Sequence, residues 1–239
     1  MHFLIIGGTG RTGALIVDEA LRQGHSVTAL VRPSSSAVAE NEKNPRKGLT
    51  FHQGSPLKQA DVEAALAAAP DSTRPVGAVI VALNPRRASD SPFAAMLPDT
   101  PDAPWKLVSG AARAVLPAMR AKGVRRLVLM SMQGAGSSWG SLNVLFRPLF
   151  MVTNMRHQIA DHNEADALVK EAAGRGEIDY VLVRPVMLAE GEAGEVRVHG
   201  DDGRGAGFMP KITRRSVARF IVDAAVRDEY VGRTPVITN

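Results

Sequence analysis

The stretch Gly7-Gly8-Thr9-Gly10-Arg11-Thr12-Gly13 decides how this chain folds. It follows a short apolar run, His2–Ile6, and it precedes a helical pattern, Arg11–Gln23, in which apolar residues recur at helical spacing. Two glycine spacings overlap in it, G-x-G-x-x-G from Gly8 and G-x-x-G-x-x-G from Gly7. A strand, a glycine-rich turn and a helix in this order are the context in which the spacing predicts a dinucleotide-binding loop.

The glycines of this loop have separate physical roles. Gly7 and Gly10 allow backbone conformations and close approaches that a Cβ atom would block. The start of the helix offers unpaired N–H groups and the positive end of the helix dipole to a pyrophosphate. Gly13 lets the helix pack tightly against the sheet. A tight strand–helix turn without a ligand is the alternative, and the required strand–loop–helix context disfavours it.

Beyond the loop, strand-type runs alternate with helical patterns along the chain. The run Val76–Ala82 is apolar at every position, which is typical of a central parallel strand buried on both faces. The alternation predicts an α/β fold, a Rossmann-like doubly wound parallel sheet. We expect a single domain over residues 1–239, in which the part from about residue 186 forms a small C-terminal substrate cap. The segments 33–48 and 84–104 break the rhythm and are interpreted as long loops.

Composition limits the possible functions. The chain has 239 residues, 45% of them apolar, and no cysteine, which excludes disulfides, thiolate nucleophiles and cysteine-ligated metals. The net charge is +5, but the basic residues are dispersed, and we expect no nucleic-acid partner. Met1 leads directly into an apolar run too short for a membrane helix, so we expect neither a signal peptide nor a membrane partner, and a cytoplasmic location. No spacing among the six histidines predicts a metal site.

The end of the second strand-type run, Ser26–Val31, bears on cofactor choice. In NAD-type sites an acidic residue at this point binds the ribose 2′-hydroxyl. Here the residue is Arg32, and no Asp or Glu occurs between Thr28 and Ala39. A guanidinium pairs well with a 2′-phosphate, so the sequence favours NADPH over NADH, with Arg11 as a second partner of the phosphates. Two ordinary surface arginines are the alternative.

At this point the sequence resembles an atypical short-chain dehydrogenase/reductase, of the NAD(P)H-binding NmrA-like and biliverdin-IXβ (flavin) reductase type. The resemblance rests on the segments 5–10, 121–128 and 180–185, the last of which reads Tyr-Val-Leu-Val-Arg-Pro, and it covers nearly the whole chain. The segment 202–205, Asp-Gly-Arg-Gly, is similar to the flavin-reductase type. These motifs indicate the superfamily and do not specify a substrate.

The resemblance also implies which residues bind the cofactor, all of them at the carboxyl ends of strands or in the glycine loop. They are Gly7, Thr9, Gly10, Arg11, Thr12 and Gly13 at the pyrophosphate; Arg32, Ser34 and Ser35 at the 2′-phosphate; Ser55 beside the adenine, where the family usually has Asp; Ala82 and Leu83 near the adenosine ribose; Ser131 and Met132 beside the nicotinamide; and Pro185 and Val186 behind its carboxamide.

The family's usual proton-transfer pair, Tyr-x-x-x-Lys, is absent, because neither Tyr180 nor Tyr230 has a lysine four residues on. Where the pair should fall stand His157 and Asp161, four residues apart on one helical face. His157 is therefore one candidate catalytic residue, and a surface pair at a helix start is the alternative. Ser131 is the other candidate, with a hydroxyl for a substrate carbonyl or the cofactor carboxamide, or for backbone capping. The neighbouring residues 162–164 are interpreted as a solvated helix face.

Hydride transfer to a flavin, tetrapyrrole or quinone needs no protein acid, because water can protonate the product. The segment 139–152 contains Trp139, Leu142, Leu145, Phe146, Leu149, Phe150 and Met151. It is interpreted either as an apolar lid over a planar substrate or as ordinary core packing.

Together these patterns predict an NADPH-dependent oxidoreductase that transfers hydride to a planar conjugated small molecule. A non-catalytic NAD(P)-sensing regulator of NmrA-like type, and a redox-silent isomerase or cyclase, remain the alternatives because the Tyr–Lys pair is missing. The expected partner is a small-molecule substrate, and the expected state is a monomer or weak homodimer.

Overall fold

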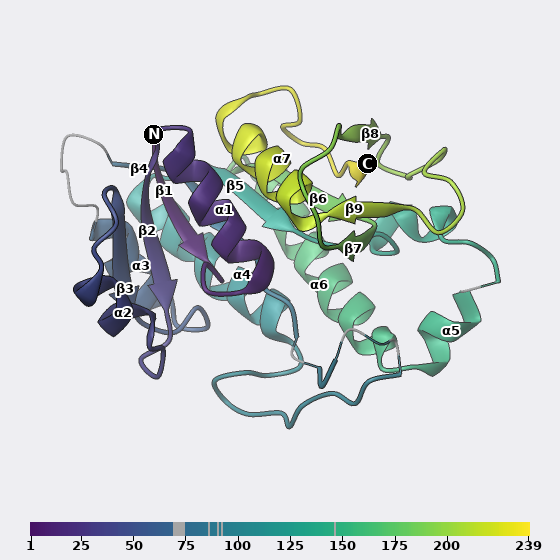
Figure 1. Ribbon diagram of the computed structural model, residues 1–239, viewed down its shortest axis with the longest axis horizontal. Coiled ribbons are helices and arrows are strands. Elements are labelled where there is room, and N and C mark those ends of the chain that lie inside the picture. The colour runs from purple at the N-terminus through teal and green to yellow at the C-terminus, as the bar shows by residue number, and fades with distance from the viewer. Residues whose placement is uncertain (69–74, 86, 90, 92, 146) are drawn as a thin grey trace.

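The computed structural model describes residues 1–68, 75–85, 87–89, 91, 93–145 and 147–239 (Figure 1). The strands are β1 His2–Ile6, β2 Ser26–Val31, β3 Leu49–Gln53, β4 Val76–Val81, β5 Arg126–Met130, β6 Asp179–Pro185, β7 Met187–Ala189, β8 Arg197–His199, β9 Lys211–Thr213 and β10 Val236–Thr238. The helices are α1 Arg11–Arg22, α2 Ala37–Lys43, α3 Gln59–Ala67, α4 Leu107–Lys122, α5 Arg147–Val152, α6 Met155–Gly174 and α7 Arg214–Val226, with a 3₁₀ turn at Gly136–Ser141.

Eight strands form one sheet in the order β3-β2-β1-β4-β5-β6-β10-β8. All neighbours pair in parallel except β10 and β8, which are antiparallel. The strand order reverses at β1, where Ile6 lies opposite Leu30 of β2 on one side and Val81 of β4 on the other. In doubly wound sheets, ligands bind at the carboxyl edge beside this switch point. The predicted Rossmann-like fold is therefore confirmed, with one antiparallel edge strand added.

Helices cover both faces of the sheet (Figure 1). The side chains of the central strands alternate between the two layers. Phe3 and Ile5 of β1 pack with Ile16 of α1 and Ile221 of α7. On the other face, the alternate residues of β1 pack with α3, α4 and α6. A strand that is apolar at every position satisfies both layers at once, which explains the uninterrupted apolar runs of the sequence.

The structure differs from the sequence-based prediction mainly in the segments interpreted as loops. Residues 33–48 contain a short helix, α2, and the C-terminal part contains a small two-stranded parallel sheet of β7 and β9. The fourth helix, α4, begins at Leu107, two residues after Trp105. The reason is local, because the backbone and indole N–H groups of Trp105 donate to Asp99 and to the carbonyl of Leu97 in the preceding loop.

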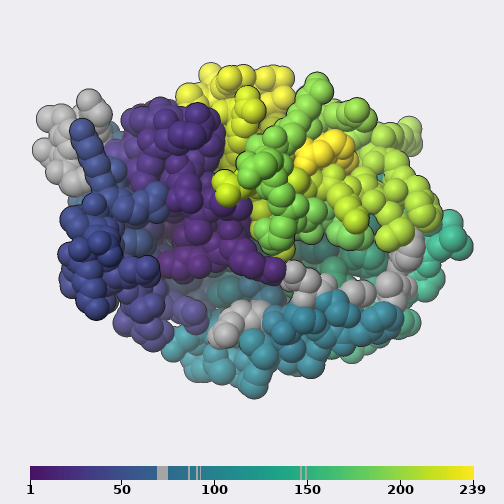
Figure 2. Space-filling view, in the orientation of Figure 1, coloured from purple at the N-terminus to yellow at the C-terminus, as the bar shows by residue number. Residues whose placement is uncertain are grey.

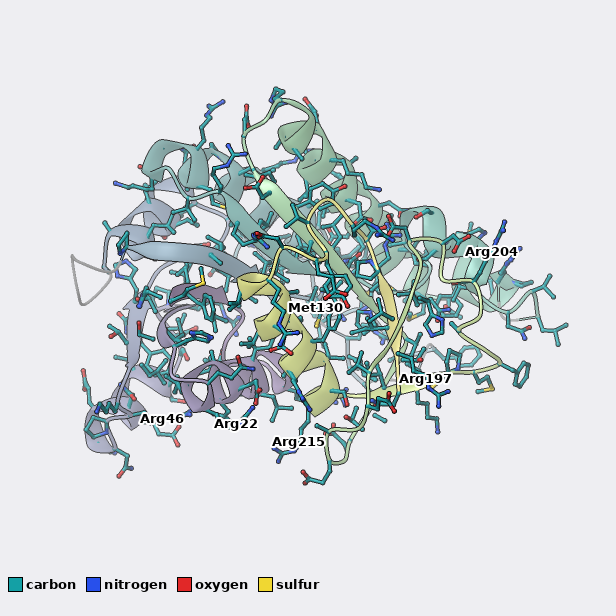
Figure 3. The ribbon with its side chains drawn as sticks, turned by 90° about the horizontal axis from the view of Figure 1, so that it is seen from above. Arg22, Arg46, Met130, Arg197, Arg204 and Arg215 are labelled. Carbon is teal, nitrogen blue, oxygen red and sulfur yellow. The ribbon has the colours of Figure 1, made fainter. Side chains whose placement is uncertain are left out.

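Positive charge is distributed over the surface. Figure 3 shows Arg22 and Arg46 at one end of the molecule and Arg197 and Arg204 at the other, with Arg215 between them. Within the described part of the chain, none of the helices is both long and apolar enough to cross a lipid bilayer.

Candidate functional site

The glycine loop lies directly after β1 at the switch point and has no room for side chains at two positions. Gly7 has φ +90°, and a Cβ atom there would lie 2.4 Å from the carbonyl oxygen of Ala82. A Cβ at Gly13 would lie 1.9 Å from the carbonyl oxygen of Gly7. The first turn of α1 therefore packs against the loop backbone at a distance that only glycine permits. Gly7 has the backbone conformation expected from the sequence, whereas the close contact at Gly13 is with the loop backbone and not with the sheet.

The N-terminus of α1 lacks a side-chain cap. Its N-cap residue, Gly10, is extended and contributes no side-chain hydrogen bond, and the first turn contains no acidic residue. The first N–H groups of a helix have no partner within the helix, so these groups suit an anion. Thr9 and Arg11 are exposed beside this end, and Thr12 is buried. The cradle fits the pyrophosphate of a dinucleotide.

The residues expected at the adenine end follow β2 and β3. Arg32 and Ser34 are exposed just beyond the end of β2, which pairs with β1 next to the glycine loop. Ser55 follows β3, and its backbone N–H donates to the Asp61 carboxylate at 2.7 Å. A Cβ at Gly54 would lie 2.9 Å from the Cβ of Asp61, so Asp61 and this glycine shape the turn together. No sequence motif contains Asp61, so it was not among the predicted site residues.

The residues expected near the adenosine ribose follow β4, and those expected at the nicotinamide lie at the ends of β5 and β6. The backbone hydrogen bonds between strands continue past the strand ends. The Ala82 N–H donates to the Ile6 carbonyl at 2.9 Å, and the Ser131 N–H donates to the Val183 carbonyl at 2.7 Å. The ends of these strands consequently lie at one edge of the sheet. That edge brings together Ala82, Leu83, Ser131, Met132, Pro185 and Val186.

A buried polar network extends inward from Ser131. Its hydroxyl contacts Asp166 of α6 at 3.2 Å, and Asp166 forms an ion pair with Arg184 of β6 at 2.5 Å. Arg184 is fully buried and Asp166 is 3% exposed. Arg184 belongs to the Arg-Pro motif of the sequence, but no function was predicted for it, and no sequence motif contains Asp166. Helical spacing alone did not indicate which face of α6 meets β5 and β6.

His157 and Asp161 share α6, as expected, but they have different partners. Asp161 is buried and accepts hydrogen bonds from the backbone N–H groups of Val108 and Ser109, both at 2.9 Å, at the start of α4. His157 is half-buried and packs against the Trp105 ring, with ring centroids 5.0 Å apart. Asp161 thus caps a helix, and the described contacts of His157 are with Trp105 and Arg156.

His162 was interpreted as part of a solvated face, and that interpretation is wrong. Its side chain is only 2% exposed, and Nδ1 has no hydrogen-bond partner among the described residues. Burial lowers the pKa of His162, against the opposing effect of the Asp161 and Asp166 carboxylates, while Arg184 lowers it further. The imidazole is therefore neutral in the folded protein.

This buried histidine predicts an acid-sensitive fold. Below the unfolded-state pKa of 6.5, the unfolded chain binds a proton at His162 that the folded protein does not. The free energy of unfolding should therefore fall as the pH drops below that value, by up to about 1.4 kcal/mol per pH unit for one proton. Chemical denaturation of wild type and His162→Gln between about pH 7.5 and 5.5 measures it. Identical pH slopes in both proteins would contradict the assignment.

Exposed apolar side chains occur in the three segments that follow β4, β5 and β6 along the chain. They are Val144, Leu145, Met151 and Val152 in and before α5; Phe93 in segment 84–104; and Met187, Phe208 and Met209 in the C-terminal part. A hydrogen bond joins the 3₁₀ turn to the C-terminal part, because the Ser137 hydroxyl donates to the Asp201 carbonyl at 2.8 Å. Figure 2 shows the blue-teal surface of segment 84–104 below the green C-terminal part.

Some residues of segment 139–152 fit the interpretation as core packing, and others fit the interpretation as an apolar lid. Leu142 is buried beside Gly134, as in ordinary packing, whereas Leu145 and Met151 are exposed, as in a lid. Phe146 lies outside the described residues.

Comparison with known proteins agrees with this geometry. A family model described as NAD(P)H-binding matches residues 7–228. The fold is similar to that of ChuY, an anaerobillin reductase from Escherichia coli O157:H7, with 19% identity, a TM-score of 0.70, and coverage of 100% of this chain and 97% of the other. It is also similar to a short-chain dehydrogenase/reductase from Veillonella parvula in complex with NADP, with 16% identity, a TM-score of 0.72, and coverage of 100% and 94%. A Rossmann-fold NAD(P)-binding family protein from Shigella flexneri matches with 19% identity, a TM-score of 0.62, and coverage of 100% and 93%.

Proposed function

The chain belongs to the NAD(P)H-binding family, and from this premise we propose that it is an NADPH-dependent reductase of a planar conjugated small molecule. The observation that carries the proposal is the uncapped start of α1, packed so closely on the loop that a Cβ at Gly13 would lie 1.9 Å from the Gly7 carbonyl oxygen. Such a cradle suits the pyrophosphate of a dinucleotide. The acceptor is a flavin, tetrapyrrole, quinone or aromatic metabolite.

Within this proposal, the phosphates and the adenosine half are held by the first half of the chain. The N–H groups at the start of α1 and the Thr9 and Thr12 side chains surround the pyrophosphate. Arg32 and Ser34, exposed beyond β2, bind the 2′-phosphate, with Arg11 beside them. Because a guanidinium binds a phosphate through two parallel hydrogen bonds, these residues give NADPH the advantage over NADH.

The second half of the chain supplies the reaction site. Bound NADPH supplies a hydride, and the chain's own residues bind, orient and exclude water. Ser131 and Met132 contact the nicotinamide, and Pro185 and Val186 lie behind its carboxamide. Residues from about 186 on form the substrate side, where the exposed side chains of Met187, Phe208 and the α5 segment suit the face of a planar, apolar acceptor. Water protonates the product, with His157 as the one side chain proposed as an alternative donor.

The position of the tyrosines favours a second candidate function. The chain has only two, and both lie toward the opposite edge of the sheet. Tyr180 pairs with Leu127 at the start of β6, and Tyr230 packs on Phe220 beyond the end of α7. Neither is therefore available to donate a proton at the carboxyl edge. A non-catalytic NAD(P)-sensing regulator or a redox-silent isomerase on the same fold would need no such tyrosine.

One experiment separates these functions. NADPH deuterated at the transferred position is incubated with the protein and with FMN, biliverdin, menadione or an aromatic ketone, and the absorbance of the reduced nicotinamide is followed. A reductase consumes NADPH with at least one acceptor. The deuterium is then found in the reduced acceptor, or in water where the position that received it exchanges with solvent. Tight NADPH binding without consumption in any mixture would favour the regulator, and isomerisation without consumption would favour the redox-silent enzyme.

A further inference from the structure

The Ser131 hydroxyl, proposed to lie beside the nicotinamide, is held by a charged group behind it. Asp166 reaches it with Oδ1, at 3.2 Å from Ser131 Oγ. The other carboxylate oxygen, Oδ2, accepts from Arg184 Nη2 at 2.5 Å. All three residues are 3% exposed or less, so the arrangement is shielded from water. One carboxylate therefore links a side chain at the end of β5 to a guanidinium at the end of β6.

Arg184 also binds two segments of the proposed substrate side of the site. Its Nη1 donates to the Ser137 hydroxyl at 2.9 Å and to the Asp201 carbonyl at 3.0 Å. Ser137 belongs to the 3₁₀ turn after β5, and Asp201 to the loop after β8. A Cβ at Gly136 would lie 2.5 Å from Arg184 Nη2, so the turn packs directly on the guanidinium. The charge needs these partners, because a buried guanidinium without them is costly.

The charges determine the direction of the Ser131 hydrogen bond. A guanidinium stays protonated in proteins, and the carboxylate that it pairs with is the charged form, which only accepts hydrogen bonds. Ser131 must therefore donate its hydroxyl proton to Asp166. A hydroxyl has one proton and two lone pairs, so Ser131 has only acceptor capacity left. Its oxygen does not donate to a substrate carbonyl while this bond persists.

We propose that Asp166 and Arg184 are positioning residues that make Ser131 a hydrogen-bond acceptor for the carboxamide N–H₂ of the nicotinamide. This inference rests on the proposed function, and it decides between the two roles that the Ser131 hydroxyl could take there. The buried pair acts through Ser131 and touches neither cofactor nor substrate. Ser131 thus orients the nicotinamide ring, and the proton of the reduction has another source.

The test compares two cofactors that differ in this one group. In the 3-acetylpyridine analogue of NADP, a methyl group replaces the amide nitrogen and its two hydrogens. Wild type should bind NADP more tightly than the analogue, by about 3- to 10-fold for one hydrogen bond. Ser131→Ala should bind the two with nearly equal affinity. Calorimetric titration gives both dissociation constants without any turnover.

Asp166→Asn tests the positioning role, because an amide can donate to Ser131 and release its hydroxyl proton. The preference for NADP should then shrink, and Ser131→Ala/Asp166→Asn should match Ser131→Ala alone, since the two residues act as one unit. A preference lost independently at each position would contradict the proposal. If Asp166→Asn does not fold, Ser131→Ala still tests whether Ser131 accepts a hydrogen bond from the carboxamide, because this variant leaves the buried ion pair in place.

Binding of 2′,5′-ADP is the control, since this fragment contains the 2′-phosphate but no nicotinamide. Its affinity should be unchanged in every folded variant. If wild type binds neither 2′,5′-ADP nor NADP, the proposed function fails. If both bind and Ser131→Ala keeps the full preference for NADP over the analogue, the proposed function stands and the role of Ser131 as an acceptor is overturned.

Discussion

Replacing Gly13 by alanine is expected to abolish NADPH binding. The added methyl group would lie 1.9 Å from the Gly7 carbonyl oxygen, and the obstacle is backbone, which cannot rotate away as a side chain can. Either α1 or the glycine loop must move, and the cradle for the pyrophosphate is lost with it. Overpacking of this kind also lowers the free energy of unfolding by about 1–3 kcal/mol, or roughly 2–4 °C in Tm for each kcal/mol. Calorimetric titration and thermal unfolding measure the two effects.

Gly174→Ala is the matched control, because this glycine ends α6 and a Cβ there would meet nothing within 4 Å. Its NADPH affinity should equal that of wild type, and its Tm should not fall. Wild-type affinity in Gly13→Ala would show that the close packing of α1 on the loop is not what binds the cofactor.

Replacing Arg32 by alanine is expected to remove the preference for NADPH. Charge-assisted hydrogen bonds contribute about 1.5–3 kcal/mol each, so the NADPH dissociation constant should rise by about 10- to 150-fold while that for NADH stays nearly constant. Arg32 is exposed beyond β2, so the fold should be unaffected. The measurement is the ratio of the two dissociation constants in wild type and variant.

Arg120→Ala removes the same charge elsewhere and serves as the control. Arg120 is an exposed residue in the last turn of α4, at the opposite edge of the sheet, and pairs weakly with Glu177 at 3.3 Å. A general effect of net charge would lower NADPH affinity equally in both variants, and the specific role of Arg32 would then be rejected.

The fold could be predicted from the sequence because the informative signals are local and redundant. The uninterrupted apolar run of β4 indicates burial on two faces, and the glycine loop requires a strand before it and a helix after it. The same reasoning missed α2 and the small β7–β9 sheet. The α2 helix is a seven-residue, largely polar segment with no buried residue. Strands β7 and β9 have three residues each, and they pair across a long stretch of chain, Met187 with Lys211.

The inner part of the candidate site could not be predicted because it depends on which face of α6 turns inward. Helical spacing places His157 and Asp161 on one face, but it does not reveal that Asp161 meets the start of α4, 52 and 53 residues away in the chain. Asp166 and His162 were not recognised as buried for the same reason. Charged residues are usually exposed, and only the position of Arg184 explains why Asp166 is not.

Binding of NADPH at the edge around the glycine loop is measured by titrating the wild-type protein with NADPH and with NADH. We expect saturable binding of both at one site, with the dissociation constant for NADPH lower by at least about tenfold, the value of one good charge-assisted contact. Equal dissociation constants for the two cofactors, or no binding of either, would contradict this expectation.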